Sequence, residues 1–107
     1  MNLPDVPTTK ILAIGRLNVE RDQIKPVMRD EVPQTVSLYL NGKIDQWFDR
    51  QDQPGVVFVL NVPTIEEARS LLEDLPLGQK GMMSFEFIPL GPLKQLAVLM
   101  SMAKGVS

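Results

Sequence analysis

Four stretches of the sequence have the pattern of β-strands, and their order is the strongest constraint on the fold. Lys10–Leu17, Val56–Leu60 and Met82–Leu90 are short, apolar and partly β-branched, whereas Lys43–Arg50 alternates polar and apolar residues. The turn sequence QDQPG (51–55) joins the second strand to the third. Because helix-like stretches fill the other two gaps, the expected order is β-α-β-β-α-β. This order predicts a ferredoxin-like α+β fold, with a four-stranded antiparallel sheet and both helices on one side of it.

The first helix-like stretch lies between the first two strands. Pro26 suits a first helical turn, but Pro33 has no N–H with which to bond the carbonyl of Arg29. We therefore expect a kink or a break near Val32. The Asn-Gly pair at 41–42 is a typical C-terminal stop. The apolar residues of this stretch recur at steps of three and four, which is helical spacing: Ile24, Val27, Met28, Val32, Val36 and Leu40.

The second helix-like stretch begins at a capping box, in which Thr64 is followed three residues later by Glu67. Pro76 and Gly78 are expected to end it. Its apolar face is formed by Ile65, Ala68, Leu71, Leu72 and Leu75. A chain of 107 residues has room for one core, so we expect one domain over 1–107. The core of that domain covers about 10–92, and a short apolar helix follows at about 93–104.

Composition excludes several classes of function. The sequence has no cysteine and no histidine, which removes disulfides, thiolate or imidazole metal sites and Ser-His-Asp triads, so we expect no metal. The net charge is −2 and no block of Lys or Arg occurs, so nucleic acid is not an expected partner. The N-terminus has no signal-peptide pattern, and the apolar C-terminal stretch is too short to span a bilayer. We therefore expect a cytoplasmic protein without a membrane partner.

The predicted sheet is too apolar for the number of helices available to cover it. Two helices cover one face, yet the strands Lys10–Leu17 and Val56–Leu60 have no polar side. At about 25 cal/mol per Å², covering roughly 600 Å² contributes on the order of 15 kcal/mol before association costs. The sequence therefore predicts a homodimer in which two sheets pack face to face as a dimeric α+β barrel. In the alternative, the C-terminal helix folds over its own sheet and the protein is a monomer.

Several short motifs between Lys10 and Leu93 resemble the muconolactone isomerase-like proteins and, more distantly, the YCII-like proteins. The matching residues are Gly42, Trp47, Asn61-Val62-Pro63, Leu75-Pro76-Leu77, Glu86 and Pro89-Leu90. The resemblance implies a dimeric α+β barrel, often assembled into larger rings. It also implies a cofactor-free proton shift within an unsaturated lactone, with a carboxylate at the position of Asp30-Glu31 as acid-base group.

The sequence departs from that family in three places. Asp45, Gln46 and Asp49 stand where the isomerases are basic and carry a histidine, and the aromatic and acidic residues before the last strand are replaced by GQKG (78–81). The C-terminal tail is an apolar helix, which we expect to contact another subunit or to act as a lid. The pocket is therefore expected to be acidic, which does not suit an anionic lactone.

Glu31 is the candidate catalytic residue. At 100° per residue it lies at the edge of the apolar helix face, while Asp30 points away. A carboxylate facing an apolar wall can exchange protons with a bound molecule. Alternatively, the Pro33 kink turns Glu31 to solvent, or Glu31 belongs to a structural ion pair.

Four further residues are candidates for substrate binding. Trp47 is the single tryptophan and can stack on a ligand or pack at the core or dimer interface. Glu86 and Ser84 share one side of the last strand, where Glu86 could line a pocket or form a salt bridge across the dimer. Arg16 is the nearest cation for a carboxylate ligand. Asp45 and Asp49 are expected to flank Trp47 as solvated charges.

The leading hypothesis is a small-molecule-binding homodimer that acts, if it is an enzyme, by cofactor-free proton transfer through Glu31. A non-catalytic binding or accessory subunit is the first alternative. The second is a cofactor-independent oxygenase of the same barrel class, in which Trp47 or Tyr39 would matter more than Glu31.

Overall fold

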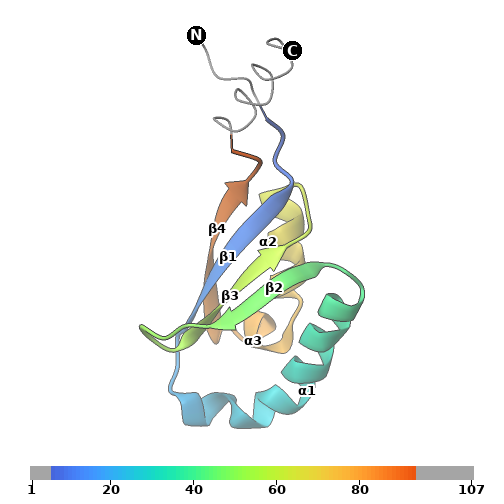
Figure 1. Cartoon of the computed structure of the whole chain (residues 1–107). Coiled ribbons are helices and arrows are strands. Elements are labelled where there is room, and N and C mark those ends of the chain that lie inside the picture. The colour runs from blue at the N-terminus through green and yellow to red at the C-terminus, as the bar shows by residue number, and fades with distance from the viewer. Residues whose placement is uncertain (1–5, 94–107) are drawn as a thin grey trace, which may run out of the picture.

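The computed structural model describes residues 6–93, and all structural statements below concern that part of the chain. Its elements follow the expected order, with one additional short helix (Figure 1). They are β1 (Lys10–Leu17), α1 (Arg21–Leu40), β2 (Ile44–Asp49), β3 (Gly55–Leu60), α2 (Ile65–Glu73), α3 (Pro76–Gln79) and β4 (Met83–Leu90). The C-terminal helix expected at about 93–104 lies outside the described residues, and so does its expected role.

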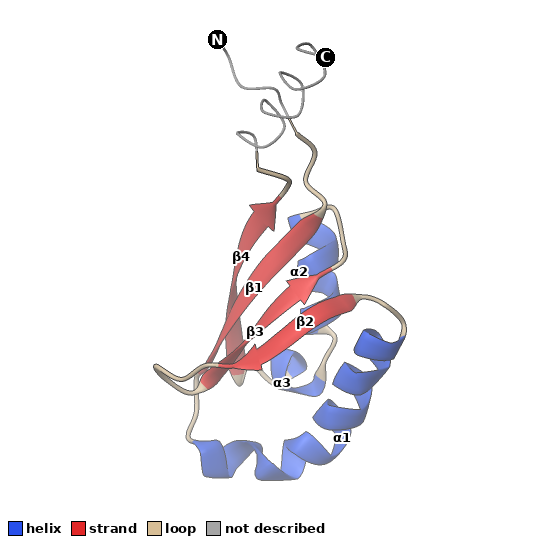
Figure 2. Ribbon diagram, in the orientation of Figure 1, coloured by secondary structure: helices blue, strands red, loops and turns tan. Residues whose placement is uncertain are grey.

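The four strands form one antiparallel sheet in the order β2-β3-β1-β4. In the centre of the sheet, Ala13 of β1 pairs with Phe58 of β3 on one side and with Phe87 of β4 on the other. The helices lie on one side of the sheet (Figure 2). This is the ferredoxin-like α+β arrangement, and the prediction of the fold from the element order is confirmed.

The core lies between the sheet and α2. Inward-facing residues of β1 and β3 meet the apolar face of α2, and Phe85 and Phe87 of β4 pack against the same cluster. The Oγ1 atom of Thr64 accepts a hydrogen bond from the Glu67 N–H at 3.2 Å, so the predicted N-terminus of α2 is confirmed. The fully buried members of the cluster with the largest side chains are Ile11, Leu60, Leu72 and Val62.

Helix α1 bends but does not break. It runs for 20 residues through both prolines, and Figure 1 shows that it changes direction part-way along its length. Pro26 was expected in a first turn, but the helix begins at Arg21, so both Pro26 and Pro33 lie inside it. Each removes one helical hydrogen bond and its ring crowds the preceding turn, which explains a bend. The predicted stop is confirmed, because the Asn41 N–H bonds the Ser37 carbonyl and Gly42 has φ +80°. The bend carries the first half of α1 along the lower end of the sheet.

The end of α2 differs from the prediction. The helix stops at Glu73, with Asp74 as its C-cap, so Leu75 is not part of it. Pro76 does not end a helix but begins one, because it is the first residue of α3. Proline is favourable at that position, where its missing N–H would have no helical partner and its fixed φ suits the helix. The Leu-Pro-Leu motif therefore connects two helices, and all three of its residues are buried.

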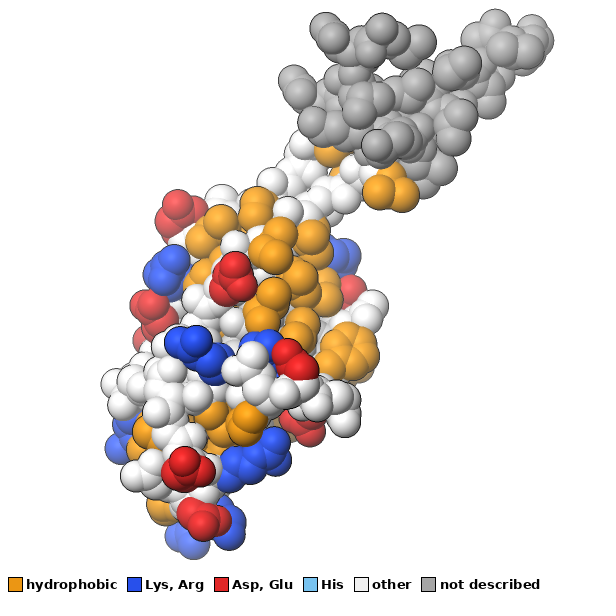
Figure 3. All heavy atoms as spheres, turned by 90° about the vertical axis from the view of Figure 1, so that its left-hand side faces the viewer, with side chains coloured by type: hydrophobic (Ala, Val, Ile, Leu, Met, Phe, Trp, Pro, Cys, Tyr) orange, Lys and Arg blue, Asp and Glu red, His pale blue; other side chains and the backbone are white. Residues whose placement is uncertain are grey.

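The sheet face opposite the helices is largely apolar. The paired positions Leu12–Ile88 and Ile14–Val57 lie on this face, as does Phe48 of β2, whose side chain is 55% exposed. Figure 3 looks onto this side of the molecule and shows a cluster of hydrophobic side chains. Phe85 and Phe87 point to the core, while Ser84, Glu86 and Ile88 point the other way, as predicted. No described helix covers this face, which we call the open sheet face.

Candidate functional site

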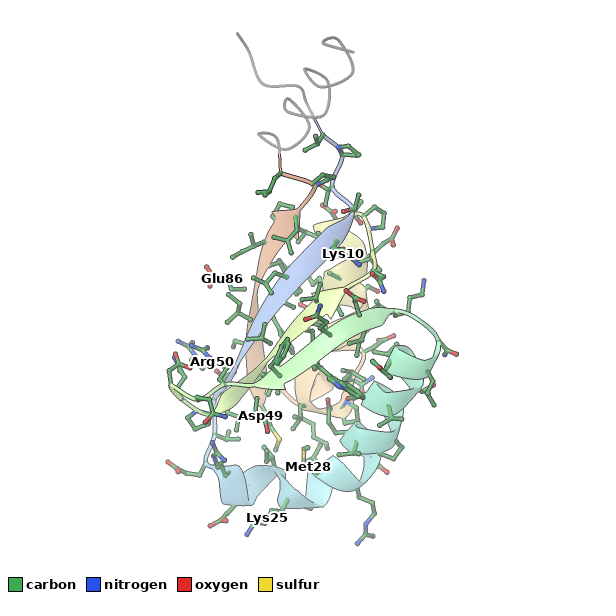
Figure 4. The ribbon with its side chains drawn as sticks, in the orientation of Figure 1. Lys10, Lys25, Met28, Asp49, Arg50 and Glu86 are labelled. Atoms are coloured by element: carbon green, nitrogen blue, oxygen red, sulfur yellow. The ribbon has the colours of Figure 1, made fainter. Side chains whose placement is uncertain are left out.

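A cavity of about 780 Å³ lies between α1 and the sheet. Sites for small organic molecules typically measure about 300–1,000 Å³, so the volume suits a ligand of that kind. Most of its lining is apolar. The apolar lining residues are Leu17, Ile24, Met28, Val32, Val36, Trp47, Phe48, Val56, Phe58, Leu77 and Met83. Figure 4 shows Met28 on the side of α1 that faces the sheet.

Glu31 is the one charged residue that is buried in the described part of the chain, with 7% of its surface exposed, and it lies in the cavity wall. Its Oε1 atom accepts a hydrogen bond of 2.9 Å from the backbone N–H of Leu77. Leu77 is in the first turn of α3, where backbone N–H groups have no partner within the helix. Glu31 therefore joins α1 to a helix 46 residues further along the chain.

The other carboxylate oxygen of Glu31 faces the hydroxyl of Thr35. Thr35 Oγ1 lies 3.2 Å from Glu31 Oε2 and 2.8 Å from the Glu31 backbone carbonyl. A hydroxyl has one hydrogen, so Thr35 can donate to either oxygen and can accept a hydrogen bond when it donates to the carbonyl. The site can thus stabilise Oε2 both as an unprotonated acceptor and as a protonated donor. A carboxylate offers about four lone-pair sites, so two protein donors leave capacity for a ligand.

Trp47 also lines the cavity and is stacked on Tyr39. The two ring centroids are 4.4 Å apart and the ring planes differ by 13°. Tyr39 therefore covers one face of the indole, so the predicted stacking on a ligand is restricted to the rest of the ring. Trp47 and Glu31 border the same cavity, which brings together two of the five residues selected from the sequence.

The other three candidates, Arg16, Ser84 and Glu86, do not line this cavity. Arg16 pairs with Ser84 across β1 and β4, and Glu86 lies two residues further along β4, all on the open sheet face. The Ser84 hydroxyl accepts a hydrogen bond of 2.8 Å from the side chain of Asn18. Strand alternation correctly placed Ser84 and Glu86 on the face opposite Phe85 and Phe87. The cavity, however, lies on the helix side of the sheet and not on the open sheet face.

The expectation that Asp45 and Asp49 both flank Trp47 is wrong. The register of β2 shifts between Ile44 and Gln46, so Asp45 is the extra residue of a β-bulge. Its carboxylate lies 3.2 Å from Lys10 Nζ, whereas Asp49 lines the cavity. A bulge inverts the side-chain alternation beyond it, and nothing in the strand pattern of the sequence marks its position.

The cavity is not acidic, contrary to the expectation from the sequence. Its charged lining residues are Arg21, Lys25 and Arg50 against Glu31 and Asp49, which is three basic residues and two acidic ones. The Lys25 ammonium is 3.0 Å from the Asp22 carboxylate and points away from the sheet (Figure 4). The prediction of an acidic pocket was wrong because Arg21 and Lys25 come from α1 and Arg50 directly follows β2, and only the fold brings these three residues together.

Arg50 was not selected from the sequence, although it is held firmly at the edge of the cavity. Its Nε and Nη2 atoms donate to the two carboxylate oxygens of Asp52 at 3.0 and 2.7 Å. Its Nη1 lies 3.5 Å from the Gly15 carbonyl. The hydrogen bonds with Asp52 raise the pKa of Arg50 and lower the pKa of Asp52. The Arg-x-Asp spacing in a turn could have suggested this pair.

The Arg50–Asp52 pair should make stability depend on pH in the acid range. Because the folded-state pKa of Asp52 lies below its ordinary value of 3.8, the pair stabilises the fold above that pH and loses its effect as pH falls through the lowered pKa. Asp52→Asn should therefore melt at a lower temperature than wild type at pH 7. The difference in melting temperature between Asp52→Asn and wild type should narrow steadily below pH 3.8. Thermal unfolding followed by circular dichroism measures it.

Asp30→Asn is the matched control, because Asp30 is exposed on α1 and forms no ion pair within residues 6–93. It removes a carboxylate without breaking an ion pair, so its melting temperature at pH 7 should be close to that of wild type. If the melting temperatures of Asp52→Asn and wild type differed by the same amount from pH 7 to pH 2, the Arg50–Asp52 pair would not stabilise the fold.

The described residues contain no group of three or more carboxylates placed to hold a metal ion. Within residues 6–93, no helix is both long enough and apolar enough to cross a bilayer.

The fold and the cavity together define a ferredoxin-like α+β protein with a small-molecule-sized space between its sheet and its long helix. No known protein-family profile matches the sequence, and no well-characterised protein sequence matches it significantly. Solved structures do match. One is 5-chloro-2-hydroxyhydroquinone dehydrochlorinase (TftG) from Burkholderia phenoliruptrix, in complex with 2,5-dihydroxybenzoquinone. The TM-score is 0.59 at 13% sequence identity, over 80% of this chain and 97% of that chain. At this identity the likeness shows the fold alone, and it supports the family resemblance at that level.

Proposed function

We propose that this chain is a cytoplasmic homodimer that binds a small cyclic organic molecule in the cavity between α1 and the sheet. The volume and the apolar lining of the cavity support this proposal. The TftG structure, which has a similar fold, was solved with a small hydroxylated ring. A ring with hydroxyl or enol groups would contact the apolar wall and donate a hydrogen bond to Glu31.

We further propose that Glu31 transfers a proton within the bound molecule without a cofactor, in an isomerase-like reaction. The observation that carries this step is the position of Glu31: a buried carboxylate in the cavity wall, beside a hydroxyl that can stabilise it in both protonation states. A proton taken from a carbon next to a carbonyl would reside on Oε2 and return to a different carbon of the same molecule. Trp47 would contact the ring beside Glu31.

The proton-transfer step predicts exchange of ligand protons with solvent. Purified protein is first analysed by native mass spectrometry for a co-purifying small molecule, and binding of that molecule is followed by the fluorescence of the single tryptophan. Incubation in deuterated buffer should then label the ligand with deuterium. Glu31→Gln should reduce labelling to the rate in buffer while the ligand still binds. Labelling that persists in this variant would exclude Glu31 as the acid-base group.

A non-catalytic binding or accessory subunit is the second candidate function. It is favoured by the two hydrogen bonds of the Glu31 carboxylate, which give this residue a structural role. In that case the ligand would bind to wild type and to Glu31→Gln with similar affinity, and neither protein would label it with deuterium.

The homodimer is proposed from the open sheet face, which no described helix covers. A second copy with its own open sheet face would bury these apolar side chains as a dimeric α+β barrel, and the family resemblance implies larger rings built from such dimers. Light scattering should therefore give twice the mass of one chain. Ile88→Asp, on this face, should give monomers, because it would bury an unpaired charge.

Leu40→Asp is the control, since Leu40 is 76% exposed at the end of α1 and does not belong to the open sheet face. It should leave the dimer intact. A wild-type monomer in dilute solution would refute the dimer while leaving the cavity proposal untouched.

A further inference from the structure

Two opposite charges on the open sheet face have no partner within residues 6–93. Glu86 projects from β4 on the side away from the helices (Figure 4). Neither its carboxylate nor the guanidinium of Arg16 forms an ion pair or a hydrogen bond in the described part of the chain, and both residues are exposed. In a monomer, water would satisfy both groups.

The strand neighbours of Glu86 on this face are apolar, and Arg50 is near enough for the charge of Glu86 to help raise the Arg50 pKa, although the two form no ion pair. The cross-strand neighbour of Glu86 is Ile14, and Ile88 follows it on the same side of β4. Figure 3 shows an acidic side chain among the hydrophobic side chains of this face. When a second copy covers the face, the carboxylate loses water, and a buried charge without a partner is strongly unfavourable. Dimer formation therefore requires a cation at this position.

Arg16 is the cation of this face that has neither an ion pair nor a hydrogen bond within residues 6–93. Arg50, at the same end of the sheet, already donates two hydrogen bonds to Asp52. Lys10 is bound to Asp45 and Asn61 at the opposite end of β1. Arg16 stands beside Ser84, diagonally across from Glu86 on the neighbouring strand, and it has not closed onto Glu86 within the chain.

The size of the face suits a second copy. Four strands of six to eight residues, about 4.8 Å apart and rising about 3.3 Å per residue, give a face of roughly 19 by 20–26 Å. Two such faces would bury roughly 800–1,000 Å² in total before side-chain relief is counted, which is the area of a small interface between two copies.

We propose that a second copy of this chain packs on the open sheet face so that Glu86 of each protomer pairs with the partner's Arg16. A two-fold axis repeats the contact, which gives two ion pairs per dimer. The inference rests on the homodimer proposed above and adds the contact that fixes how the two sheets are rotated relative to each other. Apolar contacts alone would allow several relative rotations. The two pairs select one rotation, because other rotations would bury a charge without a partner or bring like charges together.

The test uses two charge-reversal variants of the full chain. Glu86→Arg leaves two basic residues on the face, and Arg16→Glu leaves two acidic ones. Each variant alone should raise the dimer dissociation constant by at least about 100-fold, because like charges would face each other across the interface. A 1:1 mixture should form a heterodimer with a dissociation constant within about tenfold of that of wild type. Sedimentation equilibrium measures the constants, and native mass spectrometry identifies the heterodimer.

The 1:1 mixture of the two variants distinguishes an ion pair between protomers from an ion pair within one protomer. If Arg16 and Glu86 paired within one protomer, the mixture would associate no better than either variant. The result that overturns the proposal is therefore a mixture without a preferred heterodimer, or single variants that dimerise like wild type. Glu66→Arg is the matched control, because Glu66 is exposed on α2, and its dissociation constant should equal that of wild type.

Two further measurements keep the outcomes distinct. Far-ultraviolet circular dichroism verifies the fold of each variant, and the milder Glu86→Gln should raise the dissociation constant by about tenfold, since it leaves the partner's Arg16 without a counter-charge. If Ile88→Asp disrupts the dimer while the charge variants do not, the ion pair is wrong but the homodimer stands. If wild type is a monomer, the homodimer and the ion pair both fail.

Discussion

Replacing Glu31 by alanine is expected to lower the free energy of unfolding by about 3 kcal/mol. The substitution removes the acceptor of the Leu77 N–H, and an unsatisfied buried donor costs about 1–3 kcal/mol. It also leaves a space in the wall between α1 and α3, which costs more when the surroundings do not collapse into it. Since residues 6–93 contain no other hydrogen bond between side chains or backbone of α1 and α3, this change should loosen α3 first. Urea unfolding followed by circular dichroism measures the loss.

Glu31→Gln is the informative control. The amide oxygen of glutamine can still accept from Leu77, and its NH₂ group can donate to the Thr35 hydroxyl. We therefore expect this variant to lose less than about 1 kcal/mol, the net value of an ordinary hydrogen bond. Equal losses for alanine and glutamine would mean that the charge itself, and not the hydrogen bond to Leu77, holds this part of the fold.

Replacing Gly55 by alanine is the second large effect, with an expected loss of about 3 kcal/mol. A Cβ atom built on Gly55 would lie 2.1 Å from the backbone oxygen of Gly15, on the neighbouring strand. Because that oxygen belongs to the ladder between β1 and β3, the strands would have to separate, and overpacking of this kind costs about 1–3 kcal/mol or more. The midpoint of urea unfolding should fall accordingly.

Gly15→Ala tests the same reasoning from the opposite strand. A Cβ atom at Gly15 would meet side-chain atoms of Phe85, Met83 and Val56 at 2.8–3.1 Å, and no backbone atom within that distance. Side chains can shift where a backbone carbonyl cannot, so the expected loss is smaller, about 1.5 kcal/mol. Contact with the Gly15 backbone oxygen would not explain the loss at Gly55 if Gly15→Ala were the more destabilising of the two.

Local sequence patterns were sufficient for most of the fold. The strands, the capped start of α2 and the stop after Leu40 depend on residues close in sequence, and all three predictions are confirmed. The bend of α1 was predictable for the same reason, because Pro33 acts on the preceding turn. The errors lie where neighbouring elements decide the outcome. Pro76 begins a helix because α3 packs under α1 and α2, and no local pattern marks the bulge at Asp45.

The candidate site was predictable only in part. The helical wheel placed Glu31 at the edge of the apolar face, but its partner Leu77 is 46 residues away and cannot be found from spacing. Alternation assigned Arg16, Ser84 and Glu86 to one side of the sheet, yet which side faces the cavity depends on where α1 lies. Arg50 was missed because its partner is in a turn, where the pattern of apolar residues carries no information.

The bend in α1 keeps most of the cavity-lining side chains of this helix outside the folded core. The helix holds its residues Ile24, Met28, Val32 and Val36 along the cavity wall, and none of them belongs to the buried cluster between the sheet and α2. The space is therefore a property of the backbone path, and the α1 side of it is formed by side chains outside the core, whereas Phe58 on the sheet side belongs to the core. Substitutions at these four positions can therefore change the shape of the cavity without removing a contact of the buried cluster.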